Sequence, residues 1–171
     1  MLNPQHAVKQ AIRVNQAGEY GAKRIYDGQL AILGRTLAGA KIRHMAAQEQ
    51  GHLDAFNTLL HQRGVRPTIL QPLWHVAGFA LGAGTALLGE RWAMACTAVI
   101  EEVIEQHYKD QAATLGDDAP LQAAIASACA DEVEHRSEAL ASGAASVPLY
   151  GLFRAVLGTA CRGAIAAAKR W

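Results

Sequence analysis

The sequence has few cysteines and no cysteine pair. Its 171 residues contain three, widely spaced and set among alanine, isoleucine and valine. An odd number of cysteines without a Cys-x-x-Cys motif excludes a disulfide framework. We therefore expect Cys96, Cys129 and Cys161 to be reduced, buried thiols in a reducing compartment.

The sequence also lacks an excess of charge of either sign. Its 16 Lys and Arg against 15 Asp and Glu give a formal net charge of +1, and there is no acidic tail. A protein without an overall basic field has little to attract a phosphate backbone, so nucleic acid is not an expected partner. The first 15 residues have no basic region followed by an apolar block, so we expect no secretory signal there.

No stretch shows the alternation of apolar and polar residues that indicates strands. Apolar residues instead recur at three- and four-residue intervals over five long stretches, and 35 residues are alanine, which favours helix. The sequence predicts an all-α protein with one domain over residues 1–171. The expected helices cover residues 4–33, 37–63, 73–115, 118–141 and a last segment from 148, with a break in the third around 82–89. Short connections favour antiparallel neighbours, hence a four-helix bundle with an additional C-terminal helix.

The longest uncharged run covers residues 72–89, PLWHVAGFALGAGTALLG. Its length approaches that of a membrane span, but Pro72, His75 and four glycines weaken that interpretation. A helix that lies on or dips into a bilayer and an ordinary buried helix are the alternatives. Gly78 and Gly82 form a small-xxx-small pair that lets another backbone approach closely, which fits tight helix packing as well as a lipid role.

The segment 148–171 has the most uneven charge pattern of the chain, because it is apolar, contains four basic residues and has no acid. Such a helix can close a bundle or rest on anionic headgroups. Its larger apolar residues are expected on one side: Leu152, Phe153, Val156, Leu157 and Ala160.

The clearest chemical pattern is a repeated spacing of glutamate and histidine. The first half holds Glu19 and, 30 residues later, the string QEQGHL, whereas the second half holds Glu101 and, 31 residues later, the string DEVEH. Each string contains a Glu-x-x-His motif, whose two side chains project from one face of a helix. One Glu from each of two helices plus one Glu-x-x-His from each of two others is the ligand set of the di-iron carboxylate bundles. The sequence therefore predicts a dinuclear metal site held by Glu19, Glu49, His52, Glu101, Glu132 and His135.

The helical phase of each segment supports this choice of ligands. Glu19 lies on the apolar stripe of its helix, seven residues before Tyr26, and Glu101 shares a face with Tyr108 seven residues later. The neighbouring acids fall on sides that we expect to be solvated: Glu102, Glu105, Asp131, Glu134 and Glu138.

The charge balance of such a site is favourable. Buried carboxylates without a partner are costly, whereas two divalent cations neutralise four glutamates. Ligation by carboxylates with one imidazole per metal and no thiolate favours iron or manganese over zinc or copper. Cys96 and Cys129 lie near the inner faces, and we interpret them as small core residues.

Four stretches carry a family resemblance: QAGEYGAKRIYDGQ around Glu19, QEQGHL, the long string from RPTILQPLWHV to EEVIEQHY, and DEVEH. On these stretches, nearly the whole chain resembles the demethoxyubiquinone hydroxylase family, a ferritin-like di-iron group of ubiquinone biosynthesis. The resemblance implies a ferritin-like bundle whose iron ligands are the same six residues. The family's His-Tyr pair matches His107 and Tyr108, which the resemblance places near the quinone and on an electron path to iron. From the helical phase alone, Tyr108 faces the core and a structural role for His107 stays open.

The resemblance implies a monooxygenase that uses two iron ions, O2 and an external reductant, NADH among the options. Its substrate would be a polyprenylated demethoxyubiquinone or demethoxyubiquinol, hydroxylated on the ring. Implied partners are a membrane surface contacted by 72–89 and the C-terminal helix, a lipid-binding accessory protein, and other ubiquinone-biosynthesis enzymes; a homo-oligomer stays open. The expected location is the cytoplasmic face of a bacterial inner membrane, or the matrix side of the mitochondrial inner membrane for a processed chain.

Two other classes compete with this interpretation. One is a different ferritin-like di-metal protein, such as an iron oxidase, a catalase or a peroxidase, although the cysteine-rich iron module of a rubrerythrin-type peroxidase is absent from the sequence. The other is a metal-free helical bundle that docks on a membrane and binds a partner. Intact ligands at all six predicted positions disfavour it, because buried carboxylates without a cation destabilise a fold.

Overall fold

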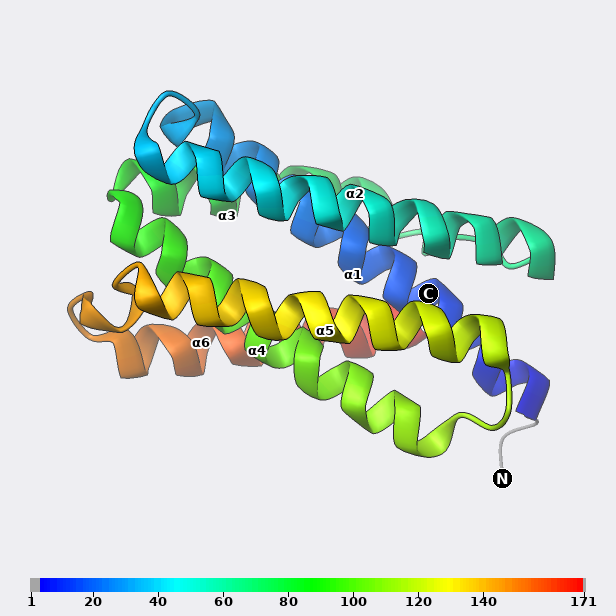
Figure 1. Cartoon of the computed structure of the whole chain (residues 1–171). Helices are drawn as coiled ribbons and strands as arrows, with labels where there is room; N and C mark the ends of the chain where they lie inside the picture. The colour runs from blue at the N-terminus through cyan, green and yellow to red at the C-terminus, as the bar shows by residue number, and fades with distance from the viewer. Residues whose placement is uncertain (1–3, 171) are drawn as a thin grey trace.

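The computed structural model, which describes residues 4–170, is built from helices (Figure 1). No strand occurs in this part of the chain, so the predicted all-α class is confirmed. The helices are α1 (Pro4–Leu33), α2 (Leu37–Arg63), α3 (Gln71–Leu87), α4 (Glu90–Thr114), α5 (Ala119–Ala141) and α6 (Tyr150–Arg170), with a 3₁₀ turn, η1 (Ala144–Ser146), before α6.

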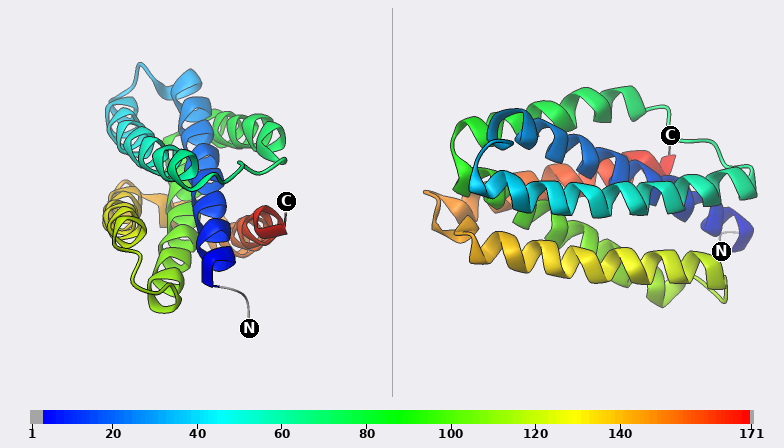
Figure 2. Two further views of the ribbon diagram at one scale, coloured as in Figure 1. Left: turned by 90° about the vertical axis from the view of Figure 1, so that its right-hand side faces the viewer. Right: turned by 45° about the horizontal axis from the view of Figure 1, so that its top comes forward.

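The helices form three layers. In the end-on view, α1 and α4 run through the middle, α2 and α5 lie on one side of them, and α3 and α6 lie on the other (Figure 2). The pairs with the most extensive packing are α1 with α3, α1 with α2, and α4 with α5. The predicted four-helix bundle therefore corresponds to α1, α2, α4 and α5. Two helices, α3 and α6, add the third layer to it.

The predicted third helix is two helices, separated at the end of the 82–89 interval. Gly89 adopts a φ of 111°, a conformation that glycine reaches without steric cost, and the chain reverses there into α4. Gly82 lies inside α3, where its backbone packs on that of α1. A Cβ built at Gly82 would lie 1.9 Å from the carbonyl oxygen of Ile25, so this glycine is required for the close approach of the two helices.

The ends of α2 and α5 are fixed by local signals and by one ion pair. Gly64 ends α2 in the left-handed conformation, with a φ of 57°. Asp118 caps α5 by accepting from the backbone N–H of Leu121, and it also accepts two hydrogen bonds from the guanidinium of Arg63 at 2.7 and 2.9 Å. These contacts hold the end of α2 beside the start of α5.

The layer formed by α3 and α6, called the outer layer below, leaves large apolar side chains in solvent. On α3, Val76 is 66% exposed, whereas Trp74 is partly buried. On α6 the predicted apolar side divides in two: Phe153 and Leu157 pack on the core, while Leu152 and Val156 stay exposed. Among residues 4–170, no helix is long and apolar enough to cross a membrane.

Two expectations about side-chain environment need correction. Glu105, predicted to be solvated, is only 7% exposed, because α5 packs over it and Arg136 pairs with its carboxylate at 2.8 Å together with Lys109. The three cysteines are free, but only Cys96 is buried, since Cys129 and Cys161 lie at the partly exposed margins of the core.

Candidate metal centre

The structure brings the six predicted ligands together in the middle of the bundle. Each of the four bundle helices contributes, and every one of these side chains is buried although all six are polar. The contributions are Glu19 from α1, Glu49 and His52 from α2, Glu101 from α4, and Glu132 and His135 from α5.

The six side chains form two overlapping groups of four. Within each group, one oxygen or nitrogen atom from each member lies within 4.8 Å of the others. The two groups share Glu49 and Glu132 and differ in their remaining members, which are Glu19 with His52 in one and Glu101 with His135 in the other. This arrangement is suited to two adjacent ions with two carboxylates between them.

Unpartnered polar atoms test whether a metal fits here. Among the described residues, buried side-chain atoms without a hydrogen-bond partner are concentrated at this cluster. Both oxygens of Glu49 and of Glu132 lack a partner, whereas Glu19 and Glu101 each have one such oxygen. The Nδ1 atoms of His52 and His135 are the other unpartnered atoms of the cluster, and outside the cluster the described residues have two more, Oε1 of Gln16 and Oε1 of Gln29. Buried polar atoms rarely remain unpaired, so a pair of cations is the partner that this donor set fits.

Two buried tyrosines hold the two carboxylates that the groups do not share, those of Glu19 and Glu101. Tyr26 of α1 donates to Glu101 of α4 at 2.6 Å, and Tyr108 of α4 donates to Glu19 of α1. Burial, followed by the charges of the nearby glutamates, raises the pKa of both phenols well above the usual value. Both tyrosines therefore stay protonated and act as donors.

Each histidine is oriented by a residue across the interface between α2 and α5. His52 Nε2 lies 2.8 Å from a carboxylate oxygen of Asp131, and His135 Nε2 lies 3.0 Å from the amide oxygen of Gln48. Since both acceptors take a proton from Nε2, the Nδ1 atoms are the ones that face the glutamates.

The electrostatics of the cluster favour cation binding. Burial, followed by the charges of the other glutamates, raises the pKa of Glu49 and of Glu132 well above the usual value, and burial raises that of Glu101 to about 7. Burial also lowers the pKa of His135 to about 4, so this imidazole is neutral and available as a ligand. Two divalent cations would balance the four carboxylates that the fold places in this apolar interior.

His107 and Tyr108 are neighbours in sequence but differ in surroundings. Tyr108 reaches the cluster through Glu19, while His107 lines a groove between α4 and α6 and its Nε2 accepts from the amide of Gln111 at 2.8 Å. Burial, and then the charge of Lys169, lowers the pKa of His107 to about 4. His107 is not a member of either group of four.

Three residues around the cluster have contacts that the sequence analysis did not foresee. Asp131 was expected to face solvent, yet it bonds to His52, because the ring extends from α2 toward the seam with α5. Gln48 was not singled out, and Tyr26 was seen only as a core residue. The signal for all three was the internal repeat, since each tyrosine follows a predicted ligand glutamate by seven residues and Gln48 and Asp131 each directly precede one.

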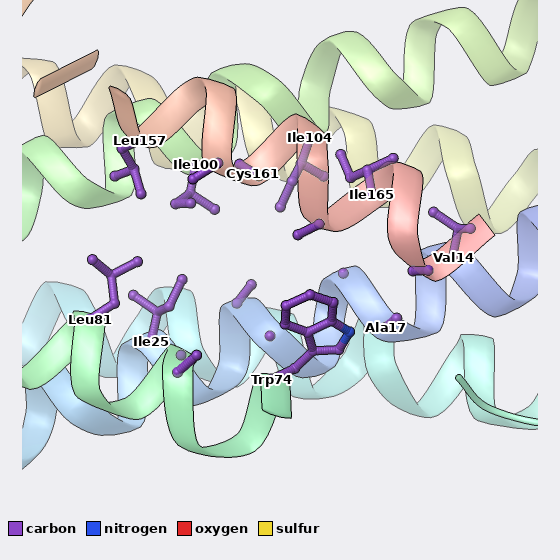
Figure 3. Close-up of a pocket in the computed structure, with 18 residues that line it drawn as sticks. Val14, Ala17, Ile25, Trp74, Leu81, Ile100, Ile104, Leu157, Cys161 and Ile165 are labelled. Carbon is purple, nitrogen blue, oxygen red and sulfur yellow. The ribbon is translucent and has the colours of Figure 1, made fainter. Parts of the chain in front are cut away.

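An apolar cavity lies on the opposite side of α1 and α4 from α2 and α5 (Figure 3). It has a volume of about 230 Å³ and is lined by α1, α3, α4 and α6. Trp74 and Leu81 line it from α3, and Ile25 and Ile104 line it from the two helices that carry Glu19 and Glu101. The cluster of glutamates and histidines and this cavity thus share the walls α1 and α4.

Comparison with known proteins gives a consistent result. The model of the family described as ubiquinone biosynthesis protein COQ7 matches residues 6–168. The chain is 51% identical over 170 residues to the 3-demethoxyubiquinol 3-hydroxylase of Rhodospirillum rubrum, covering 98% of this chain and 80% of that protein. It is 47% identical over 169 residues to the NADPH-dependent 3-demethoxyubiquinone 3-hydroxylase, mitochondrial, of Homo sapiens, covering 96% of this chain and 78% of that protein. It is 37% identical over 177 residues to the 5-demethoxyubiquinone hydroxylase, mitochondrial, of Saccharomyces cerevisiae, covering 93% of this chain and 76% of that protein.

Proposed function

Because this chain belongs to the COQ7 family of ubiquinone biosynthesis proteins, we propose that it hydroxylates the ring of a demethoxyubiquinone or its quinol with O2. The observation that carries the proposal is the buried cluster of four glutamates and two histidines, which has the donor set of a di-iron centre. The names of the relatives support the same reaction.

The proposed metal centre uses the two groups of four as two ligand sets. Glu49 and Glu132 would contact both ions, and each ion would have one further glutamate and one histidine. Two ferrous ions held by these residues would supply the electrons needed to activate O2 for the hydroxylation of an aromatic ring. Tyr26 and Tyr108 hold the terminal carboxylates in place through their hydrogen bonds.

The apolar cavity is the proposed site of the substrate. Its lining offers almost no hydrogen-bonding side chain, which suits a polyprenylated ring better than a polar metabolite. The walls it shares with the metal cluster, α1 and α4, would keep the ring close to the ligand glutamates. Of the proposed His-Tyr pair, Tyr108 contacts the predicted ligand Glu19 directly. His107 makes no such contact, and we propose that it acts through its hydrogen bond with Gln111.

The outer layer is the proposed contact with a membrane. The cavity lies between α3 and α6, and these two helices expose Val76, Leu152 and Val156 to solvent. A peripheral position on a bilayer would cover these side chains and allow a lipid tail to enter between α3 and α6. Either predicted location, at a bacterial or a mitochondrial inner membrane, provides such a surface.

The remaining partners follow from the same reaction. A reduced nicotinamide nucleotide is the proposed external reductant, in keeping with relatives that are named NADPH-dependent. The exposed apolar face of α3 and α6 would also suit a lipid-binding accessory protein, another enzyme of ubiquinone biosynthesis or a second copy of the chain.

The competing classes account for fewer of these features. An iron oxidase, catalase or peroxidase on the same scaffold needs the metal cluster but not an apolar cavity along α1 and α4. A metal-free binding bundle leaves the unpartnered atoms of six buried residues unexplained.

The first experiment is the iron content after anaerobic reconstitution, measured for the wild type beside Glu101→Ala and Glu132→Ala. We expect about two irons per chain in the wild type, as for the di-iron carboxylate bundles, and a sharp fall in both variants. The loaded wild type is then given demethoxyubiquinol and isotopically labelled O2, and mass spectrometry should find the label in the ring. Equal iron in all three proteins would show that the ligand assignment is wrong, and iron without ring hydroxylation would favour an iron oxidase.

A further inference from the structure

The two halves of the chain supply equivalent sets of residues to the cluster. Glu19 and Tyr26 of α1 are seven residues apart, as are Glu101 and Tyr108 of α4, and each tyrosine donates to the glutamate of the other pair. The two Glu-x-x-His motifs, on α2 and α5, are likewise equivalent. An exchange of α1 and α2 with α4 and α5 therefore reproduces the six ligands and the tyrosine contacts.

The histidine contacts break this equivalence. The residue that directly precedes each motif glutamate bonds to the histidine of the other motif, but it is Gln48 on α2 and Asp131 on α5. His135 therefore donates its Nε2 proton to a neutral amide, whereas His52 donates its proton to a carboxylate. The two hydrogen bonds are nearly equal in length, 3.0 and 2.8 Å, so the difference is in charge more than in geometry.

The carboxylate of Asp131 acts on His52 without competition from a cation. Within the described part of the chain, no Lys or Arg forms an ion pair with Asp131, and His52 is its one charged or polar partner within bonding distance. A carboxylate that accepts the N–H of an imidazole makes the opposite ring nitrogen a stronger donor, and its negative charge adds attraction for a cation. An amide acceptor orients the ring but adds no charge.

We propose that the two metal positions are inequivalent, with the position formed by Glu19, Glu49, His52 and Glu132 binding its ion more tightly and filling first. This inference rests on the proposed metal centre. The other position, formed by Glu49, Glu101, Glu132 and His135, holds the weaker and more exchangeable ion. Asp131 is the positioning residue that creates the difference, and it acts through His52.

The surroundings of the two histidines also differ in access to the surface. A cavity of about 360 Å³ between α2 and α5 is lined by His44, Gln48 and His135. His135 is 1% exposed and His52 is 8% exposed, so the difference between the two positions rests on the acceptors Asp131 and Gln48 and not on access to solvent. Asp131 and His52 are not among the residues that line this cavity.

The test is a titration of the metal-free protein with Co²⁺ under anaerobic conditions, followed by calorimetry and by visible absorption. In the wild type we expect two binding steps that differ by about 10-fold or more, the scale on which hydrogen-bond partners of ligands alter metal affinity. Glu101→Ala removes a ligand of the weaker position only, so it should lose the weak step and bind about one ion per chain, in the tight step. Glu19→Ala removes a ligand of the tighter position only, so it should retain the weak step.

The matched variants exchange the two acceptors. Asp131→Asn keeps an oxygen acceptor for His52 but removes the charge, and it should weaken the tight step by about 10- to 100-fold with little effect on the other. Gln48→Glu places a carboxylate on His135, and it should strengthen the weak step. Helical content by circular dichroism checks that both variants are folded. Two equal steps in the wild type, or equal weakening of both steps by Asp131→Asn, would overturn the inequivalence while leaving the metal centre intact, whereas no binding at all would overturn the metal centre itself.

Discussion

The hydroxyl of Tyr26 donates a hydrogen bond to Glu101 across the bundle, with the two oxygens 2.6 Å apart. Tyr26 is on α1 and Glu101 is on α4, so the contact links the two helices of the middle layer in the buried interior. Tyr108 and Glu19 make the same contact with the helices exchanged. Each half of the chain thus supplies the donor that fixes a carboxylate of the other half, and neither half can complete its part of the cluster alone.

Removal of the hydrogen bond between Tyr26 and Glu101 should lower the stability of the metal-free protein. Tyr26→Phe leaves both oxygens of Glu101 buried without a partner, and an unsatisfied buried acceptor costs about 1–3 kcal/mol. We expect a lower free energy of unfolding in urea by that amount. Tyr20→Phe is the control, because the hydrogen bond that it removes, to His75, is near the surface and should cost less. Equal losses in the two variants would contradict a special role for the Tyr26 contact.

Neutralising a shared carboxylate should stabilise the metal-free protein while preventing metal binding. Burial raises the pKa of Glu132 above its unfolded value, so this carboxyl stabilises the fold below the unfolded pKa and loses that contribution as the pH rises through the folded pKa. Metal-free Glu132→Gln should therefore match the wild type near pH 4.5 and be more stable than the wild type at pH 8. Urea unfolding at both pH values measures this.

The matched control for that prediction is Glu134→Gln, on the exposed side of the same helix. It should leave the stability of the metal-free protein unchanged at both pH values and should keep the stabilisation that added Fe²⁺ gives the wild type. A metal-free Glu132→Gln protein that is less stable than the wild type at pH 8 would show that the cluster is not strained by its own charge.

The sequence was sufficient to identify the six clustered residues because their pattern is local. An i, i+3 pair such as Glu49 and His52 must project from one face of a helix, and the apolar stripe of each helix shows which face is inward. A break within residues 82–89 was also foreseeable, because glycine weakens a helix, but its position at Gly89 was not, since Gly82 lies inside α3. The fold class follows from the same periodicity.

The contacts that were missed depend on distances between helices, which the periodicity of one helix does not contain. Asp131 is off the apolar stripe of α5, yet its carboxylate lies 2.8 Å from Nε2 of His52 on α2. Glu105 is buried because Arg136 and Lys109 neutralise it, and the Arg136 contact bridges α4 and α5. The position of α3 on α1 likewise depends on the close approach at Gly82.

Membrane binding should depend on the outer layer and not on exposed apolar residues elsewhere. Val76 of α3 is 66% exposed, and Val76→Asp would place a charge where the proposed contact with acyl chains is made. We expect weaker cosedimentation with vesicles that contain anionic lipid. Leu37→Asp is the control, because Leu37 is 92% exposed at the start of α2, in the opposite layer. Equal binding by Val76→Asp and the wild type would exclude α3 from the contact.

Filling the apolar cavity should abolish hydroxylation without disturbing the metal centre. Gly21 of α1 lines the cavity, and a Cβ built there meets no atom within 4 Å, so the side chain of Gly21→Leu would begin in open space beside the cavity. Replacing glycine inside a helix also removes a destabilising residue, so the variant should unfold at a temperature no lower than the wild type. We expect full iron content and a loss of quinol hydroxylation. Gly163→Leu is the control, because Gly163 is an exposed residue of α6 with open space around it and should keep its activity. If Gly21→Leu binds iron and still hydroxylates at the wild-type rate, the substrate does not occupy this cavity, and the shared walls of α1 and α4 have only a structural role.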